Sequence, residues 1–215
     1  MKKKENSYSE SEGQTRAIKF IKILKYETTP KDIDIFEFLS ALTMQQIDPS
    51  SISQFHIRTN AKIVFHSPLK RAIDILELKE GVEYIRMNEL SEILFDIKKL
   101  CTKKEWQEEK SNIVRRRFKE FFINDQLPIK RVEIFNEIKR VLNNCLSRSE
   151  FFDITIISHS FRLKLIEIFI ETKGEIVEIP VLIHKYLLDD KKTYEFGEGF
   201  ILKREELEEL KNILK

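Results

Sequence analysis

Apolar runs that end at a polar residue and lead directly into a helical pattern constrain the fold of this chain most. The run at 61–65 is followed by Ser67 and Pro68, and the run at 151–158 is followed by His159 and a second helical pattern. Short runs rich in β-branched residues indicate buried strands, and serine before proline is typical of a helix start. Strands that alternate with helices predict an α/β fold, a three-layer α/β/α sandwich around a central, mostly parallel sheet.

The rest of the pattern adds strands and one long helical segment. We expect strands at 18–24, 82–86 and 200–202, one or two more within 177–188, and helices after Pro30, over much of 91–146 with a break near Pro128, and at the C-terminus. A polar, Ser/Glu-rich stretch at 1–15 predicts a loose tail. We therefore expect a single domain over 16–215, with a helical insert at about 91–146.

Composition narrows the class of protein. At 215 residues, with 41% hydrophobic and 34% charged residues, the chain has the composition of a globular domain. The 38 basic residues nearly balance 36 acidic ones, which gives no reason to expect nucleic acid as a partner. Without an apolar run long enough to cross a bilayer, we expect no membrane partner and a cytoplasmic location. Cys101 and Cys145 lack metal-ligand spacing, so we expect no metal and no cofactor.

The turn after the run at 61–65 has the composition of a phosphate site. Ser67 can cap a helix, Pro68 suits its first position, and Arg71 stands about one turn inside. The start of a helix favours an anion, and a guanidinium adds a two-pronged grip on phosphate. The alternative is an ordinary strand-to-helix turn with a solvated arginine.

Polar groups follow each of the first four expected strands. Ligands of open α/β sheets bind beyond the carboxyl ends of the strands, so these groups form a candidate site. In strand order they are Lys25 with Tyr26, Ser67 with Arg71, Glu89, and His159.

Three segments in this order carry a resemblance to a known family. The segment 67–72 resembles a Ser-Pro-Leu-x-Arg-Ala element, 87–89 resembles Leu-x-Glu, and 156–159 resembles a second histidine motif. Over roughly residues 17–205 the chain resembles the histidine phosphatase superfamily, also called phosphoglycerate mutase-like. The resemblance implies that Arg71 binds phosphate, that Glu89 donates a proton to the leaving oxygen, and that His159 binds the transferring phosphoryl group.

The chain departs from this family where the family's nucleophile should stand. The family opens with Arg-His-Gly, whose histidine is phosphorylated, whereas here Lys25, Tyr26 and Glu27 occupy those positions. A phenol with a pKa near 10 is a poor nucleophile at neutral pH, although Lys25 can still neutralise phosphate charge. We therefore expect a degenerate member that binds a phosphorylated small molecule or phosphoprotein with little hydrolysis. Tyr26 would fill the vacated position near His159.

Two alternatives remain open. The chain is an active phosphomonoesterase if His66, at the end of the second strand, leans into the pocket and acts as the nucleophile, or if water attacks directly. It is a scaffold with a vestigial pocket if the insert at 91–146 binds another protein. Glu92 lies close to Glu89, and either carboxylate could be solvated on a loop. We assign no role to His56, or to His184, which we expect on a late strand.

Overall fold

The structure is a computed structural model of the 215-residue chain. It describes residues 18–22, 60–69, 72, 78–109, 111–149, 153–188 and 199–214, and for 18–22 it describes the backbone. The expected helix after Pro30 lies outside these ranges. Of the expected helix after Pro68, Ala72 is described and is helical.

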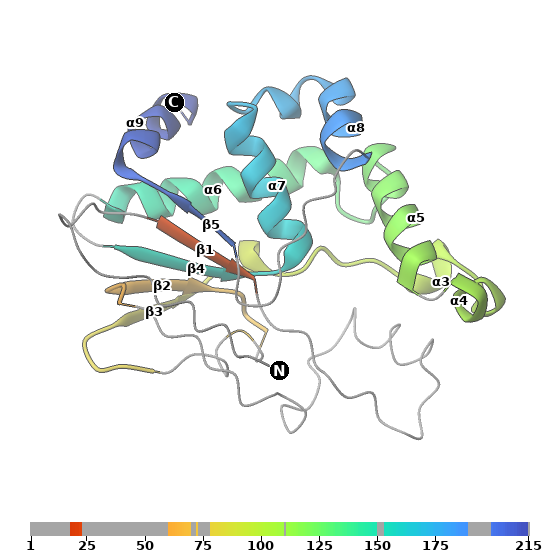
Figure 1. Cartoon of the computed structure of the whole chain (residues 1–215), viewed down its shortest axis with the longest axis horizontal. Coiled ribbons are helices and arrows are strands. Elements are labelled where there is room, and N and C mark those ends of the chain that lie inside the picture. Colours follow the sequence, from red (N-terminus) through yellow and green to blue (C-terminus); the bar gives the residue numbers. More distant parts are fainter. Residues whose placement is uncertain are drawn as a thin grey trace, which may run out of the picture.

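The described strands form one mostly parallel sheet (Figure 1). They are β1 (Ile18–Lys22), β2 (Ile63–His66), β3 (Glu83–Arg86), β4 (Ile154–Ser158) and β5 (Gly199–Leu202), in the order β3-β2-β4-β1-β5. The strands β1 to β4 run parallel, and β5 pairs antiparallel with β1 at one edge. The carboxyl ends of β1 to β4 therefore meet along one side of the sheet.

Helices account for most of the remaining described chain. They are η2 (Asn88–Leu90), α3 (Ile97–Leu100), α4 (Lys103–Glu109), α5 (Ser111–Ile123), α6 (Arg131–Ser149), α7 (Ser160–Glu171), η3 (Glu175–Val177), α8 (Pro180–Leu188) and α9 (Arg204–Ile213). The helix α6 packs against β4, and α7 packs against β1 (Figure 1). The short helices α3 and α4 pack against α5, away from the sheet. The fold is mixed α/β.

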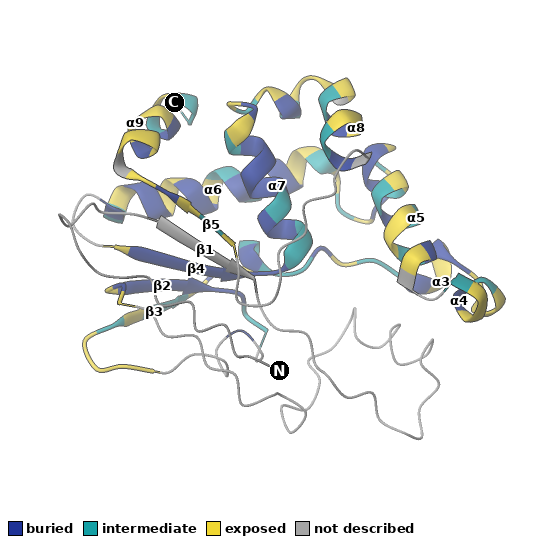
Figure 2. Cartoon of the chain, in the orientation of Figure 1, coloured by how far each residue is buried: buried dark blue, intermediate teal, exposed yellow. Residues whose placement is uncertain are grey.

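The core lies where these helices meet the sheet. Every residue of β2 and of β4 is buried, as Figure 2 shows. Strands that are buried on both faces read as continuous apolar runs, which is the usual pattern of parallel sheets. On α6, the buried residues Ile134, Ile138, Val141 and Cys145 recur at helical spacing.

The expected strands at 18–24, 61–65, 82–86, 151–158 and 200–202 are confirmed, with bounds that differ by a few residues where the neighbouring residues are described. The break near Pro128 is also confirmed, because α5 ends at Ile123 and α6 begins at Arg131.

The expected strands within 177–188 are wrong, because this segment ends η3 and forms α8. Pro180 begins α8, and proline suits the first position of a helix. The periodicity of a short apolar run does not distinguish a strand from a helix. His184, which we expected on a strand, is an exposed residue of α8.

Candidate functional site

Ser67 and His159 meet at the carboxyl ends of two neighbouring strands. Ser67 directly follows β2 and His159 directly follows β4. The Ser67 backbone N–H donates to the Ile157 carbonyl at 3.1 Å, which extends the pairing of these strands by one residue. The Ser67 Oγ then lies 3.0 Å from Nε2 of His159. Both residues are buried, so this bond forms away from bulk water.

The hydroxyl of Ser67 also begins the following helical turn. The backbone N–H of Leu69 donates to the Ser67 Oγ at 3.3 Å, and Ala72 N–H donates to the Leu69 carbonyl at 2.8 Å. This is the bonding of a helix cap, as the sequence predicts. One hydroxyl thus connects the turn after β2 to the imidazole after β4.

A carboxylate lies on the other side of the His159 ring. Its Nδ1 is 3.5 Å from Oε2 of Glu92, whose side chain is partly exposed. In the neutral ring, Nδ1–H points at Glu92 and Nε2 accepts from Ser67, whereas the imidazolium donates to both. His159 can therefore gain or lose a proton without giving up either neighbour.

The order hydroxyl, imidazole, carboxylate is also that of serine hydrolases. Here, however, the Ser67 Oγ also accepts the N–H of Leu69, and it is buried together with His159. The serine therefore orients His159, and a ligand that binds Nε2 has to take the place of Ser67.

Glu89 is the proton donor that the resemblance implies, but its carboxylate pairs with an arginine and not with His159. It lies in η2, and its Oε1 is 3.2 Å from Nε of Arg140 on α6. The carboxylate beside His159 is that of Glu92. Sequence analysis noted Glu92 only as a neighbour, because the turn of η2 decides which carboxylate faces the histidine.

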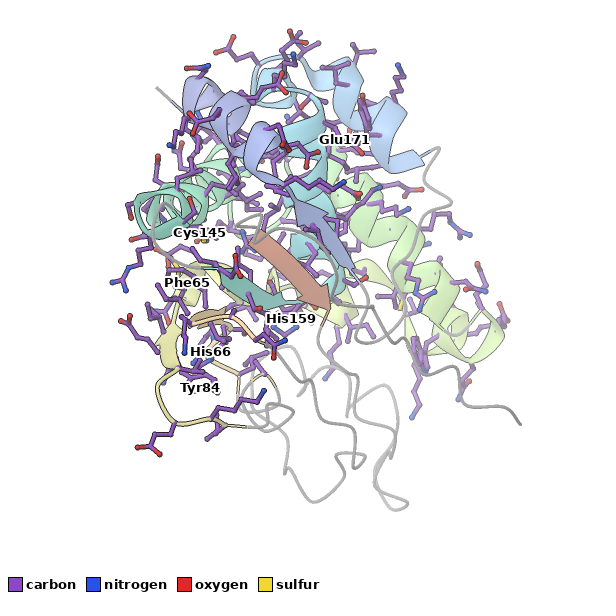
Figure 3. The ribbon with its side chains drawn as sticks, turned by 60° about the vertical axis from the view of Figure 1, so that its left-hand side comes forward. Phe65, His66, Tyr84, Cys145, His159 and Glu171 are labelled. Carbon is purple, nitrogen blue, oxygen red and sulfur yellow. The ribbon has the colours of Figure 1, made fainter. Side chains whose placement is uncertain are left out.

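His66 ends β2 and is 8% exposed. Its Nδ1 is 2.8 Å from the backbone carbonyl of Ser67, so Nδ1 carries the proton and donates it. Burial lowers the pKa of His66, the bond to the carbonyl opposes this, and the nearby Arg86 lowers the pKa further. The ring is therefore neutral at pH 7 and has its lone pair on Nε2. Figure 3 shows His66 and His159 at the ends of neighbouring strands.

A groove of about 500 Å³ opens beside Glu89, between the end of β3 and α6. Its size falls in the range of small-molecule sites. The lining side chains are Phe65, Ile85, Arg86, Met87, Asn88, Glu89, Asn144 and Arg148. The groove offers apolar surface from β2 and β3 and polar groups at its rim. Glu89 is a predicted site residue that lines it.

Sequence analysis missed one charged residue that lies close to these groups. Arg162, in the first turn of α7, is 3% exposed. Its Nη2 is 2.9 Å from Oε2 of Glu137, and its Nε donates to the Ser91 carbonyl at 3.2 Å. An arginine in the first turn of a mostly apolar helical run was the signal that could have found it.

Three predicted site residues, Lys25, Tyr26 and Arg71, lie outside the described residues. Among the residues that are described, no group of three or more His, Cys, Asp or Glu side chains is arranged to hold a metal ion. No helix in the described ranges combines the length and apolar character needed to cross a bilayer. In comparisons with known proteins, no family model, no curated protein and no solved structure matches this chain.

Proposed function

We propose that this chain is a degenerate histidine-phosphatase-like protein that binds a phosphorylated small molecule or phosphoprotein and hydrolyses it slowly or not at all. The observation that carries the proposal is the 3.0 Å bond between Ser67 and His159. Each residue belongs to one of the segments that resemble the family. Their meeting at the ends of adjacent parallel strands supports a shared site at this edge of the sheet.

The chemistry of this edge suits an oxyanion. His159 is the N-cap of α7, a helix of 12 residues, so it directly precedes a helix end at which the N–H groups of the first turn favour an anion. An imidazolium paired with Glu92 can donate a charge-assisted hydrogen bond to phosphate by exchanging Ser67 for the ligand. Arg71 and Lys25 would add the fixed positive charges.

The proposed architecture is the three-layer sandwich with its helical insert at 91–146. The complete burial of β2 and β4 supports it, because both faces of these strands are covered. Cys101 and Cys145 are free thiols, which supports a reducing, cytoplasmic setting. In this arrangement the groove beside Glu89 would take the part of the ligand beyond its phosphate.

Little turnover is proposed because Tyr26 stands where the family has its nucleophilic histidine. Attack by a phenol needs a base or a strong positive field, and the resulting phosphate ester would be a stable product. An exchange that restores the family's residues tests this directly. Tyr26→His with Glu27→Gly is expected to raise aryl phosphate hydrolysis, and an unchanged rate would mean that more than the nucleophile has been lost.

A second candidate function, a working phosphomonoesterase, is favoured by the state of His66. Its neutral ring, with the proton held on Nδ1 by the Ser67 carbonyl, leaves Nε2 as a nucleophile. Nε2 would attack phosphorus while the ester P–O bond breaks and the leaving oxygen takes a proton from water. Water would then break the P–N bond and release phosphate and the free imidazole.

Anion binding and hydrolysis by the purified 215-residue chain separate these candidates. We expect orthophosphate and vanadate to raise the melting temperature, since a ligand at one hundred times its Kd stabilises a fold by about 2.7 kcal/mol. His159→Asn should weaken this shift, whereas His184→Asn, on the exposed side of α8, should not. Hydrolysis of an aryl phosphate should stay near background.

Two results would overturn the proposal. A melting temperature that no phosphate, vanadate or phosphorylated ligand changes would favour the scaffold that binds a protein through its helical insert. Hydrolysis well above background that His66→Asn abolishes and His184→Asn preserves would favour the phosphomonoesterase.

A further inference from the structure

Arg162 is a buried cation, and removing its charge from water costs free energy. It is 3% exposed, its pKa is lowered by burial, and the carboxylates of Glu137, Glu92 and Glu89 oppose that shift. Well-packed apolar residues often stabilise a fold as well as a buried ion pair does. The need for stability therefore does not by itself explain a guanidinium at this position.

Three consecutive residues after β3 are held by the corner between β4 and α7. The Ser158 hydroxyl donates to the Leu90 carbonyl at 2.8 Å. The Arg162 Nε donates to the Ser91 carbonyl at 3.2 Å, and the carboxylate of Glu92 then lies 3.5 Å from His159 Nδ1. Arg162 thus holds the backbone of the residue that precedes Glu92.

Arg162 is itself held in place by α6. Its Nη2 lies 2.9 Å from Oε2 of Glu137, while its Nη1 is buried without a hydrogen-bond partner among the described residues. A guanidinium can bridge a carboxylate and a carbonyl because its donors point in fixed, different directions. Glu137 therefore fixes the direction in which Nε reaches Ser91.

We propose that Arg162 is a positioning residue, which holds Glu92 against His159 and so favours the imidazolium that binds the phosphoryl group. The role in binding rests on the proposed function. In the imidazolium, Nδ1–H faces the Glu92 carboxylate, which leaves Nε2–H to donate to Ser67 or, in its place, to the ligand. Groups behind a ligating histidine commonly act in this way.

The test compares Arg162→Met with the double variant Arg162→Met/Glu137→Met. The single variant leaves Glu137 without its cation, so we expect a lower urea midpoint, a smaller fraction of imidazolium at His159 near neutral pH, and about tenfold weaker orthophosphate binding. The double variant removes both charges of the pair, so the urea midpoint should recover. The protonation of His159 and the affinity should stay altered, since Ser91 remains unheld.

Arg117→Met is the matched control. Arg117 also bonds one carboxylate and one backbone carbonyl, those of Glu105 and Leu100, but it lies on α5 away from the sheet. Its loss should change neither the protonation of His159 nor the Kd for orthophosphate. Long-range proton–nitrogen NMR correlations of the ¹⁵N-labelled imidazoles report the protonation of each ring nitrogen, and calorimetry reports the Kd.

Recovery of the urea midpoint, the His159 protonation and the affinity together in the double variant would mean that Arg162 serves the fold alone, and would overturn the proposal. An unchanged His159 spectrum in Arg162→Met would overturn it as well. If the unaltered chain does not bind orthophosphate, the proposed function fails, and the NMR comparison still decides whether Arg162 positions Glu92.

Discussion

The Oγ of Ser67 lies 3.0 Å from Nε2 of His159, although the two residues are 92 positions apart in the chain. The parallel pairing of β2 with β4 creates this contact, since each residue directly follows its strand. Because both side chains are buried, the bond fixes the orientation of the imidazole at the edge where ligands of such sheets bind.

Ser67→Ala is expected to lower the free energy of unfolding by about 1–3 kcal/mol, because it removes the hydroxyl that bonds both His159 Nε2 and the Leu69 N–H in a buried position. It should also weaken orthophosphate binding. Ser149→Ala is the control, since that buried hydroxyl bonds a carbonyl of its own helix, that of Leu146. Urea denaturation and calorimetry measure the two effects. Equal losses in both variants would show that Ser67 has no special role.

Glu92→Gln and Glu89→Gln should affect anion binding differently. Removing the Glu92 charge takes away the carboxylate that favours an imidazolium at His159, so orthophosphate should bind more weakly. Glu89 pairs with Arg140, and losing its negative charge should not weaken the binding of an anion. Calorimetry at low ionic strength compares the two. The opposite pattern would make Glu89 the partner of the histidine.

The stability of the fold should fall as the pH drops below about 6.5. The pKa of His66 is lowered in the folded state, chiefly by burial, so the unfolded chain binds this proton more readily. The native state therefore keeps its full stability at a pH above the pKa that His66 has in the unfolded chain. It loses stability as the pH falls from there toward the lower pKa of His66 in the folded state. His66→Gln should reduce this loss, whereas His184→Gln should not. Urea midpoints between pH 5 and pH 7.5 give the comparison, and identical profiles for all three proteins would contradict it.

Neither cysteine should react with a thiol reagent in the native state. Cys145 is fully buried on α6, and burial raises its pKa far above the usual value. The pKa of Cys101 is raised by burial and by Glu105. Since the thiolate is the reactive species, labelling at pH 8 should proceed at the rate of unfolding and accelerate in urea. Rapid labelling of the native chain would contradict the packing around these thiols.

The strands were the part of the fold that sequence could predict. The runs around Ile63–His66 and Ile154–Ser158 are β-branched, apolar and bounded by polar residues, which is the local signal of a buried parallel strand. The same local signal misled at 180–188. There the buried residues Ile183 and Leu187 lie four apart on one face of a helix, a spacing that a short run does not distinguish from a strand.

By itself, the sequence determined which residues stand at strand ends. Ser67 and His159 each follow an apolar run, because polar groups end a buried strand at the edge of the sheet, and Glu89 follows the alternating run at 82–86. Only the tertiary structure decided their partners. The strand order places Ser67 beside His159, and the turn of η2 places Glu92, not Glu89, near the imidazole. The helix α6 supplies the carboxylate of Glu137, which pairs with the buried Arg162. Such pairings depend on distances between segments far apart in the chain, and no local pattern encodes them.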